Sequence, residues 1–496
     1  MMRYLLTSLL FLSTVAVAQD EPWTPDIEAW NSPRPPQPDA VVIRNATVWS
    51  ATDAGIMDNT DVLIRRGEIA AVGPDLRAPS GAVEVDGTDH HLTPGIVDNH
   101  SHAAILGGVN EASRISTADV RIRDVVDSES INIYRQLAGG VTTINLLHGS
   151  ANAIGGQMAT IKMRWGAPPD QLIFDEARPG IKFALGETPK QSNWRPAEPR
   201  YPQTRPGVAQ VIREKFQQAA DYQAERDSAP TGRAARAQVP PRPNHEMDAI
   251  ARILRGDLDV HSHAYRADEI LALMRTAESF GFQIKTIQHV LEGYKIASQM
   301  AEHGAGGSTF IDWWNFKAEA TDAIGYNPAI MNQAGVLTAL HSDNPELARR
   351  MNLDAAKAVR YGGVDAHEAL KMITAYSADQ IGAGHAIGRI TEGHDADVVL
   401  WDGHPLSAFS KVQQTWVDGR RYFDRQADQR MQQAIAEERQ ELIALALDAD
   451  GSSDDEAGEA SEPAPGHQHT FNFARHLTGY RPSELDHDEY CVFHAN

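Results

Sequence analysis

The stretch Leu92-Thr-Pro-Gly-Ile-Val-Asp-Asn-His-Ser-His102 holds the pattern that decides the fold. A short apolar run leads into His100 and His102, which are two residues apart. In a β-strand, residues i and i+2 point to the same face, so both imidazoles project in one direction. Two imidazoles at the carboxyl end of a strand suit a divalent metal ion, and barrel enzymes place their chemistry at that end.

The quoted stretch begins a longer segment, residues 92–385, in which short apolar runs alternate with helical stretches. Residues 141–147 are one such run, and residues 267–279 are one such helix. This alternation over nearly 300 residues favours a parallel sheet closed into a (β/α)8 barrel of the TIM type. An insertion at about residues 190–258 is dense in Pro, Arg, Gln and Ala. The predicted fold class is therefore α/β.

Runs typical of β-strands flank the barrel segment on both sides. Residues 39–91 contain several of them, separated by glycines, and residues 386–425 contain two more. We expect the two flanks to join in one small β-sandwich domain. Residues 426–447 are expected to form a helix, and residues 448–496 an acidic, disordered tail.

The first residues have the features of an export signal. Arg3 supplies a positive charge, an apolar stretch follows, and Ala16-Val-Ala18 offers small residues for cleavage. We therefore expect residues 1–18 to be a signal peptide, residues 19–38 a linker, and the product periplasmic or secreted. The apolar stretch is too short to span a membrane, so no membrane insertion of the mature chain is expected.

Charge and cysteine content narrow the classes of partner. The formal net charge is −22, which argues against binding to nucleic acid because such binding needs a basic surface. The single cysteine, Cys491, cannot form an intrachain disulfide. The sequence allows a homo-oligomer without indicating one.

Three motifs together resemble the amidohydrolase superfamily, in particular its imidazolonepropionase- and prolidase-like members. They are the stretch quoted above, Gly139-Gly-Val-Thr-Thr143, and Gly388-Arg-Ile-Thr-Glu-Gly-His-Asp-Ala-Asp-Val-Val399. The resemblance covers about residues 40–425. It implies a barrel whose strands carry metal ligands in a fixed order.

The resemblance implies ligands beyond the first pair of histidines. The matching positions are Lys182 on the fourth strand, His261 on the fifth, His289 on the sixth and Asp343 on the eighth. A buried, unpaired ammonium is costly, and in the family a carbamylated lysine bridges two metals as a carboxylate. Glu187 is the alternative to the lysine, and His263 the alternative to His261. Two divalent ions are implied, with zinc favoured over manganese, cobalt or iron.

Other candidates surround these ligands. Asp343 is expected to act as general base, although an aspartate there can also cap a helix near Pro345. His341 lies on the same strand face and can polarise a substrate carbonyl or tune Asp343. The substrate-binding candidates are His263, Tyr265, Arg266, Trp313 and Trp314. Surface placement of Tyr265 and Arg266, or simple packing of the tryptophans under a loop, is the alternative.

The resulting hypothesis is an exported, metal-dependent amidohydrolase that cleaves an amide C–N bond with a metal-bridging hydroxide. Its expected substrate is a small-molecule amide or peptide: a dipeptide, an N-acyl amino acid or a cyclic amide. A mononuclear deaminase or imidazolone-type ring hydrolase is the alternative within enzymes, since such sites lack the bridging lysine. A non-catalytic exported binding protein is the alternative of another class.

Overall fold

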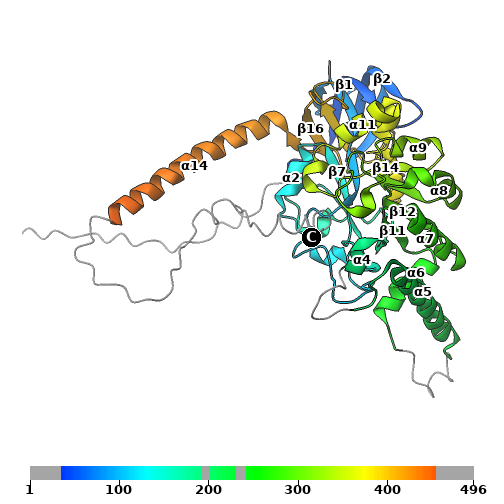
Figure 1. The fold of residues 1–496 in the computed structure, drawn as a ribbon. Coiled ribbons are helices and arrows are strands. Elements are labelled where there is room, and N and C mark those ends of the chain that lie inside the picture. Colours follow the sequence, from blue (N-terminus) through cyan, green and yellow to red (C-terminus); the bar gives the residue numbers. More distant parts are fainter. Residues whose placement is uncertain (1–34, 192–199, 231–241, 454–496) are drawn as a thin grey trace, which may run out of the picture. The chain divides into compact units, whose positions relative to one another are not determined.

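The computed structural model describes residues 35–191, 200–230 and 242–453, and these form a mixed α/β structure (Figure 1). The predicted signal peptide, most of the predicted linker and residues 454–496 of the predicted tail lie outside the described residues. Within the described ranges, no helix has both the length and the apolar character needed to cross a membrane.

Segments from both flanks form one eight-stranded sheet of order β17-β16-β15-β5-β1-β2-β3, with β4 paired to β1. The two flanks meet where β5 pairs antiparallel with β15. A second face-to-face sheet of these segments is absent from the described residues, so the expected β-sandwich is not what the structure shows. The strands are β1 (Ala40–Trp49), β2 (Ile56–Arg65), β3 (Glu68–Gly73), β4 (Val83–Asp86), β5 (His91–Pro94), β15 (Val398–Trp401), β16 (Val412–Val417) and β17 (Arg420–Asp424).

Two further sheets carry the strands that lead to the histidines. In the first, β6 (Ile96–Ser101) and β7 (Val141–Leu146) are parallel, and β9 (Ala159–Lys162) is antiparallel to β7. The second has the order β14-β13-β12-β11-β10-β8, with only β8 antiparallel to its neighbour. Its strands are β8 (Ile154–Gln157), β10 (Gly180–Ala184), β11 (Asp259–Ala264), β12 (Ile284–His289), β13 (Gly306–Thr309) and β14 (Thr338–Leu340).

The strand pairing among the described residues does not close these two sheets into the single barrel that the sequence predicts. One break lies between β8 and β9, which follow each other in the chain but pair with different sheets. The other break is bridged by a segment outside any strand. Leu340 of β14 donates to the Met372 carbonyl, and Val97 of β6 donates to the Ile373 carbonyl, both at 2.9 Å.

Helices follow most of the parallel strands. Among them, α7 packs on β12, while α13 packs on both β6 and β14 and so reaches the histidine-bearing edge. The helices and 3-10 turns are η1 (Ile122–Val125), α2 (Ile131–Leu137), α3 (Pro169–Leu172), α4 (Glu187–Gln191), α5 (Arg205–Ser228), α6 (His245–Leu254), α7 (Ala267–Ser279), η3 (Gly293–Lys295), α8 (Ala297–His303), η4 (Ala318–Ala320), α9 (Asn327–Gln333), α10 (Pro345–Ala348), α11 (Met351–Gly362), α12 (Ala366–Lys371), α13 (Ala375–Gln380) and α14 (Arg425–Ser453).

The predicted insertion contains two helices, α5 and α6. Each begins at a residue whose side chain accepts a backbone N–H of the first turn, Thr204 for α5 and Asn244 for α6. Phe216 of α5 is fully buried and its ring lies 4.6 Å from that of Phe282. The insertion is therefore joined to the barrel segment by an apolar contact.

Candidate metal centre

Two histidines and one aspartate converge where β6 and β14 end. His100 is the penultimate residue of strand β6, His102 directly follows the strand, and Asp343 follows β14. The Nε2 atoms of His100 and His102 lie 3.2 and 3.1 Å from Asp343 Oδ1. Ligand atoms around a tetrahedral zinc ion are separated by about 3.3 Å. The three side chains therefore have the spacing of one metal site, and all three are buried.

Neither imidazole offers a proton to that carboxylate oxygen. Nδ1 of His102 lies 2.9 Å from the Leu147 carbonyl, which only accepts, so the ring proton is on Nδ1. Nζ of Lys182 donates to Nε2 of His100 at 3.0 Å, while Nδ1 of His100 donates to Gln288 Oε1 at 3.2 Å. The carboxylate oxygen they face is buried without a hydrogen-bond partner. Three electron-rich atoms facing one another are what a cation stabilises.

The fourth strand brings its lysine to this centre. Lys182 lies in the middle of β10, is buried, and reaches Nε2 of His100 with its Nζ. Glu187, the alternative, begins α4 instead, and its carboxylate lies 3.7 Å from Arg205. The structure thus places the lysine, and not the glutamate, beside the histidines.

The two histidines of β11 have different surroundings. His261 is in register with Lys182, and its Nδ1 accepts a hydrogen bond from Gln288 Nε2 at 3.2 Å. His263 is one layer nearer the carboxyl end of the strand, and its ring lies 4.6 Å from that of His289. The Nε2 atom of His263 is buried without a hydrogen-bond partner. Nδ1 of His261 is thus already engaged, whereas Nε2 of His263 is available to a ligand.

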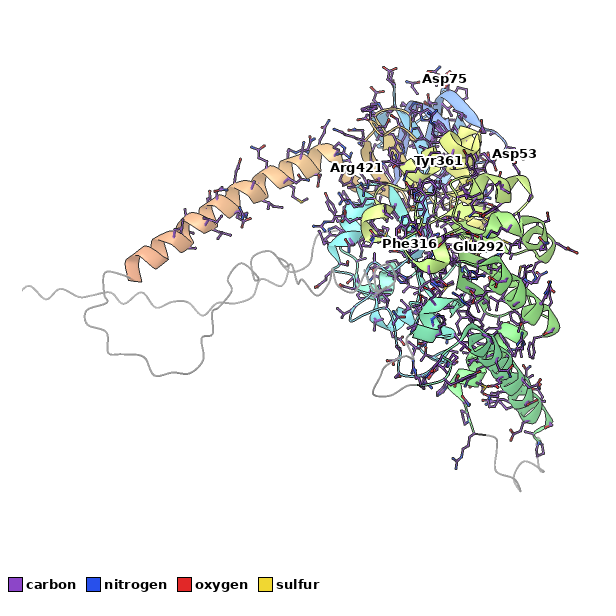
Figure 2. The ribbon with its side chains drawn as sticks, viewed as in Figure 1. Asp53, Asp75, Glu292, Phe316, Tyr361 and Arg421 are labelled. Carbon is purple, nitrogen blue, oxygen red and sulfur yellow. The ribbon has the colours of Figure 1, made fainter. Side chains whose placement is uncertain are left out.

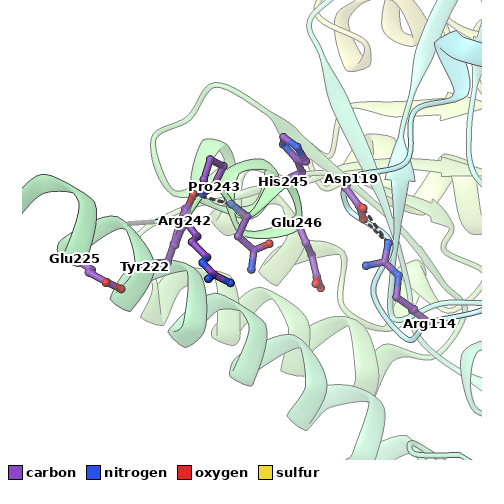
Figure 3. Close-up of a pocket in the computed structure, with 9 residues that line it drawn as sticks. Arg114, Asp119, Tyr222, Glu225, Arg242, Pro243, His245 and Glu246 are labelled. Atoms are coloured by element: carbon purple, nitrogen blue, oxygen red, sulfur yellow. Dashed lines mark hydrogen bonds and ion pairs between the residues drawn. The ribbon is translucent and has the colours of Figure 1, made fainter. Parts of the chain in front are cut away.

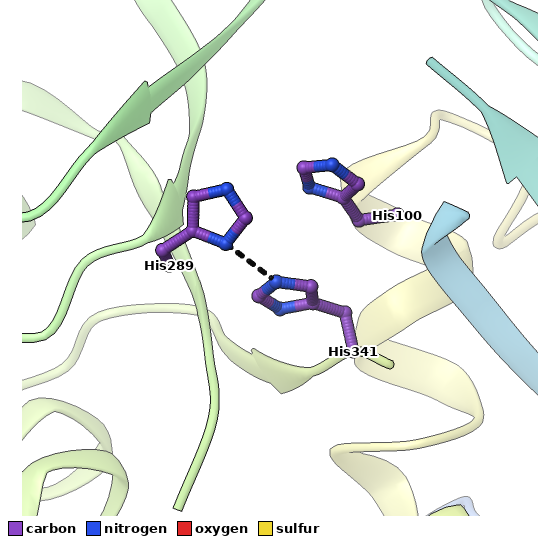
Figure 4. A group of neighbouring side chains, drawn as sticks. All are labelled: His100, His289 and His341. Atoms are coloured by element: carbon purple, nitrogen blue, oxygen red, sulfur yellow. Dashed lines mark hydrogen bonds between the residues drawn. The ribbon is translucent and has the colours of Figure 1, made fainter. Parts of the chain in front are cut away.

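A second group of ligand atoms is formed by three histidines, shown in Figure 4. His100, His289 and His341 have ring nitrogens within 4.8 Å of one another. Nδ1 of His289 lies 2.9 Å from Nε2 of His341. His100 belongs to both groups, so the described residues hold two adjacent sets of candidate ligands.

Burial keeps these imidazoles neutral, which is the form that binds metal. Desolvation lowers the pKa of His341 to about 3 and that of His261 to about 4. It also lowers the pKa values of His100, His263 and His289. The nitrogen and oxygen donors present, without any thiolate, fit zinc or another borderline divalent ion.

The backbone is strained at two of these positions. His289 has φ 70° and Asp343 has φ 50°, which non-glycine residues rarely adopt. The Asp343 N–H is held by the His100 carbonyl at 3.1 Å, and both the N–H and hydroxyl of Ser342 bond to the carboxylate of Asp98. Burial raises the pKa of that carboxylate to about 7. Asn344, rather than Asp343, caps α10, so the capping alternative for the aspartate does not hold.

Aromatic rings line one side of the centre. The ring of Tyr265 stacks on His289 at 5.2 Å, and Phe310 stacks between His289 and Trp313 at 5.1 and 4.2 Å. Phe316, labelled in Figure 2, contacts Tyr265 edge-on at 6.0 Å. Of the predicted substrate residues, His263 and Tyr265 therefore adjoin His289, and Trp313 is separated from it by the ring of Phe310.

Two predicted substrate residues lie elsewhere. The guanidinium of Arg266 pairs with Asp268 at 3.0 Å, because both flank the start of α7 and are solvent-accessible. Trp314 is 47% exposed, and its nearest ring neighbour is Tyr361 at 6.5 Å. The sequence pattern placed them near the chemistry, but adjacent residues in these loops point in different directions.

A polar pocket of about 580 Å³ lies outside this centre, between α5, α6 and residues 114–119 (Figure 3). Several of its side chains are already paired. Arg114 bonds Asp119 at 2.7 Å, and Glu246 pairs with Lys215 at 2.8 Å. It contains none of the candidate metal ligands.

Comparison with known proteins fits this geometry. The sequence model of the amidohydrolase family matches residues 91–421. The chain belongs to the amidohydrolase family. This confirms the resemblance inferred from the three motifs, and family members depend on metal ions for activity.

Among amidohydrolase relatives, the chain is 30% identical over 426 residues to the amidohydrolase tasK of Hapsidospora irregularis, covering 77% of this chain and 43% of that protein. It thus spans less than half of that relative's length. An amidohydrolase structure from Thermotoga maritima MSB8 is 33% identical with a TM-score of 0.71, covering 77% of this chain and 100% of that one. A putative prolidase from Bifidobacterium longum shares the fold at 17% identity, with a TM-score of 0.50 and coverage of 78% and 95%.

The sequence did not reveal the residues that orient the ligands. Asp98 and Asn99 lie within the quoted stretch, and Gln288 directly precedes a predicted ligand, so their positions were a usable signal. Gln380, on α13, carried none, because a glutamine in a helix resembles any surface residue.

Proposed function

We propose that the chain is an exported, metal-dependent amidohydrolase that cleaves the amide C–N bond of a dipeptide, an N-acyl amino acid or a cyclic amide. The observation that carries this proposal is the approach of the His100 and His102 Nε2 atoms to Asp343 Oδ1 at 3.2 and 3.1 Å. Family membership supports hydrolysis of a C–N bond. Export is supported by the sequence of residues 1–18 alone.

Two divalent ions, zinc or else manganese, cobalt or iron, would be held by the clustered ligands. His100, His102 and Asp343 would hold one ion, and His263 and His289 the other. Lys182 would bridge them after reaction of its neutral amine with carbon dioxide, which gives a carbamate and releases a proton. Carbamylation also replaces a buried ammonium, whose ionisation is costly, with a ligand.

When bound, the metal would supply Lewis-acid activation of water and of the amide carbonyl. The buried carboxylate of Asp343 would also take the proton from water and return it to the leaving nitrogen. The ring of Tyr265, stacked on His289, and the ring of Trp313, stacked on Phe310, would exclude bulk water and hold the acyl portion of the substrate.

The direct experiment combines a chelator with a conservative variant. Activity on N-acyl amino acids, Xaa-Pro dipeptides and cyclic amides should disappear with a strong chelator and return with zinc or manganese. Asp343→Asn should lower kcat by about 100-fold or more, because it removes the proton acceptor. Asp354→Asn, a buried aspartate paired with Lys357 outside the centre, is the matched control. Activity that survives both chelation and Asp343→Asn would refute the proposal.

The bridging role of Lys182 has its own test. Elemental analysis should find two metal ions per chain in the unaltered protein and fewer in Lys182→Ala. Glu187→Gln should keep both ions, because Glu187 pairs with Arg205. One ion in the unaltered protein, with no loss in Lys182→Ala, would instead favour a mononuclear site.

A further inference from the structure

A buried chain of polar side chains runs from α13 to the candidate metal centre. Its members are Gln380 at the end of α13, Asn99 in β6, Ser308 in β13 and His341 after β14. All four are at most 1% exposed. None of these contacts was expected from the sequence, and the proposed hydrolysis assigns no role to the first three residues.

The direction of the hydrogen bonds is fixed at the Gln380 end. Nε2 of Gln380 lies 3.1 Å from the Gly307 carbonyl and 2.8 Å from the Leu337 carbonyl. Backbone carbonyls only accept, so the amide nitrogen must face them and Oε1 must face the other way. Oε1 then accepts from Nδ2 of Asn99 at 2.5 Å. The rotated amide would place an oxygen against two carbonyl oxygens.

This direction propagates to the histidine. Because Nδ2 of Asn99 faces Gln380, its Oδ1 faces Ser308 and accepts the Ser308 hydroxyl proton at 2.7 Å. That hydroxyl has one proton, so its oxygen can only accept from Nδ1 of His341 at 3.0 Å. A neutral ring with its proton on Nδ1 has a lone pair on Nε2.

We propose that Gln380, acting through Asn99 and Ser308, fixes the proton of His341 on Nδ1, so that His341 presents its Nε2 lone pair to the histidine cluster as a metal ligand. Nε2 lies 2.9 Å from Nδ1 of His289, within the group formed with His100. The metal-ligand part of this inference rests on the proposed function. The assignment of the proton does not.

This assignment excludes one of the roles expected for His341. A ring that polarises a substrate carbonyl must donate an N–H to it, and the only N–H of His341 is engaged by Ser308. Gln380, Asn99 and Ser308 are therefore positioning residues, which act on the centre through His341 rather than on substrate. Residues that hydrogen-bond to a metal ligand in this way typically influence the affinity of the site for the metal.

The position of the ring proton can be read directly. Metal-free protein labelled with 15N at histidine is examined by long-range 1H–15N correlation near neutral pH, and His341 is assigned by the signals lost in His341→Gln. We expect the Nδ1–H tautomer in the unaltered protein and in Ser308→Thr, which keeps the hydroxyl. Ser308→Ala should shift His341 towards the Nε2–H tautomer. An Nε2–H tautomer in the unaltered protein would overturn the proposal.

Metal affinity gives the second readout. In competition with a zinc-binding dye, Ser308→Ala should weaken zinc binding by about 10- to 100-fold, and Ser308→Thr should restore it. Ser377→Ala is the matched control, because Ser377 is a buried serine of α13 whose hydroxyl bonds the Met372 carbonyl. Unchanged affinity in Ser308→Ala, with an unchanged unfolding temperature, would contradict the ligand role. Neither readout depends on catalysis. A failure of this inference can therefore be distinguished from a failure of the proposed hydrolysis.

Discussion

A single hydrogen bond distinguishes the two histidines of β11. Gln288 donates to Nδ1 of His261, whereas Nε2 of His263 is buried without a partner. The family pattern had favoured His261 as the ligand, with His263 as the alternative. Sequence spacing cannot separate them, because both residues point to the same strand face.

We predict that His263→Gln lowers zinc affinity more than His261→Gln does. The physical reason is that Gln288 already occupies Nδ1 of His261, whereas Nε2 of His263 is buried without a partner one layer nearer the carboxyl end of the strand. Zinc competition measured on both variants checks this, with the loss for His263→Gln expected to be about 10-fold or more. A larger loss for His261→Gln would reverse the assignment.

Residue patterns predicted which side chains would gather, but not how their protons are arranged. His100 and His102 follow from their position at the end of an apolar strand, and Lys182 and Asp343 follow from the resemblance to the family. The partners that set their tautomers do not. The Leu147 carbonyl is a backbone group, and Gln380 reaches Asn99 across 281 positions of sequence.

At the scale of elements, one buried cation joins β9 to the flanking sheet. Nζ of Lys162 lies 2.5 Å from the carboxylates of both Asp395 and Asp418, and 3.3 Å from that of Asp397. Burial raises the pKa of Asp397 to about 7 despite this cation. For Asp418, the Lys162 and Arg164 charges outweigh burial and lower its pKa. The positive charge of Lys162 thus offsets the repulsion among three closely spaced carboxylates in the folded state.

Lys162→Met should lower the free energy of unfolding by about 3–5 kcal/mol, because it leaves buried carboxylates without their cation. The loss should be larger at pH 8 than at pH 5. Without the lysine, the folded-state pKa values of these carboxyls rise, so their protonation favours the folded state at low pH and this support disappears as pH rises.

Denaturant unfolding at both pH values measures this difference. Lys411→Met, at an exposed lysine outside the cluster, is the control and should leave stability within about 0.5 kcal/mol. An equal loss for Lys162→Met at pH 5 and pH 8 would show that the carboxylates do not respond as described.

Sequence patterns predicted which flanking segments form strands, but they did not predict how those strands pack. The two flanking segments pair through β5 and β15. The sequence could not predict whether these strands form one sheet or two stacked sheets. Alternating apolar residues fit a single sheet with one face packed on helices as well as they fit two stacked sheets. Closure of the barrel also depends on β8 and β9, which are short and antiparallel to their neighbours.

For the whole molecule, metal binding should stabilise the fold, because the ligands come from β6, β10, β11, β12 and the segment after β14. A ligand at 100 times its dissociation constant contributes about 2.7 kcal/mol. We therefore predict that chelation lowers the unfolding temperature and that added zinc restores it. The shift should shrink in Asp343→Asn. An identical unfolding temperature with and without metal would argue against a site built from these strands.

The family is defined by most of the chain, whereas the substrate is set by loops that differ among relatives. The match covers only 43% of the Hapsidospora irregularis protein, so the activity of that whole protein cannot be transferred to this chain. What this chain is shown to share with other amidohydrolases is the family's sequence pattern over residues 91–421. Metal binding can therefore be tested before the substrate is known.

The most direct test is a zinc titration of metal-free protein, followed by amide hydrolysis at each addition. We predict no activity without metal, a rise with added zinc and a plateau at two equivalents per chain. Full activity before any metal is added would contradict metal-dependent hydrolysis.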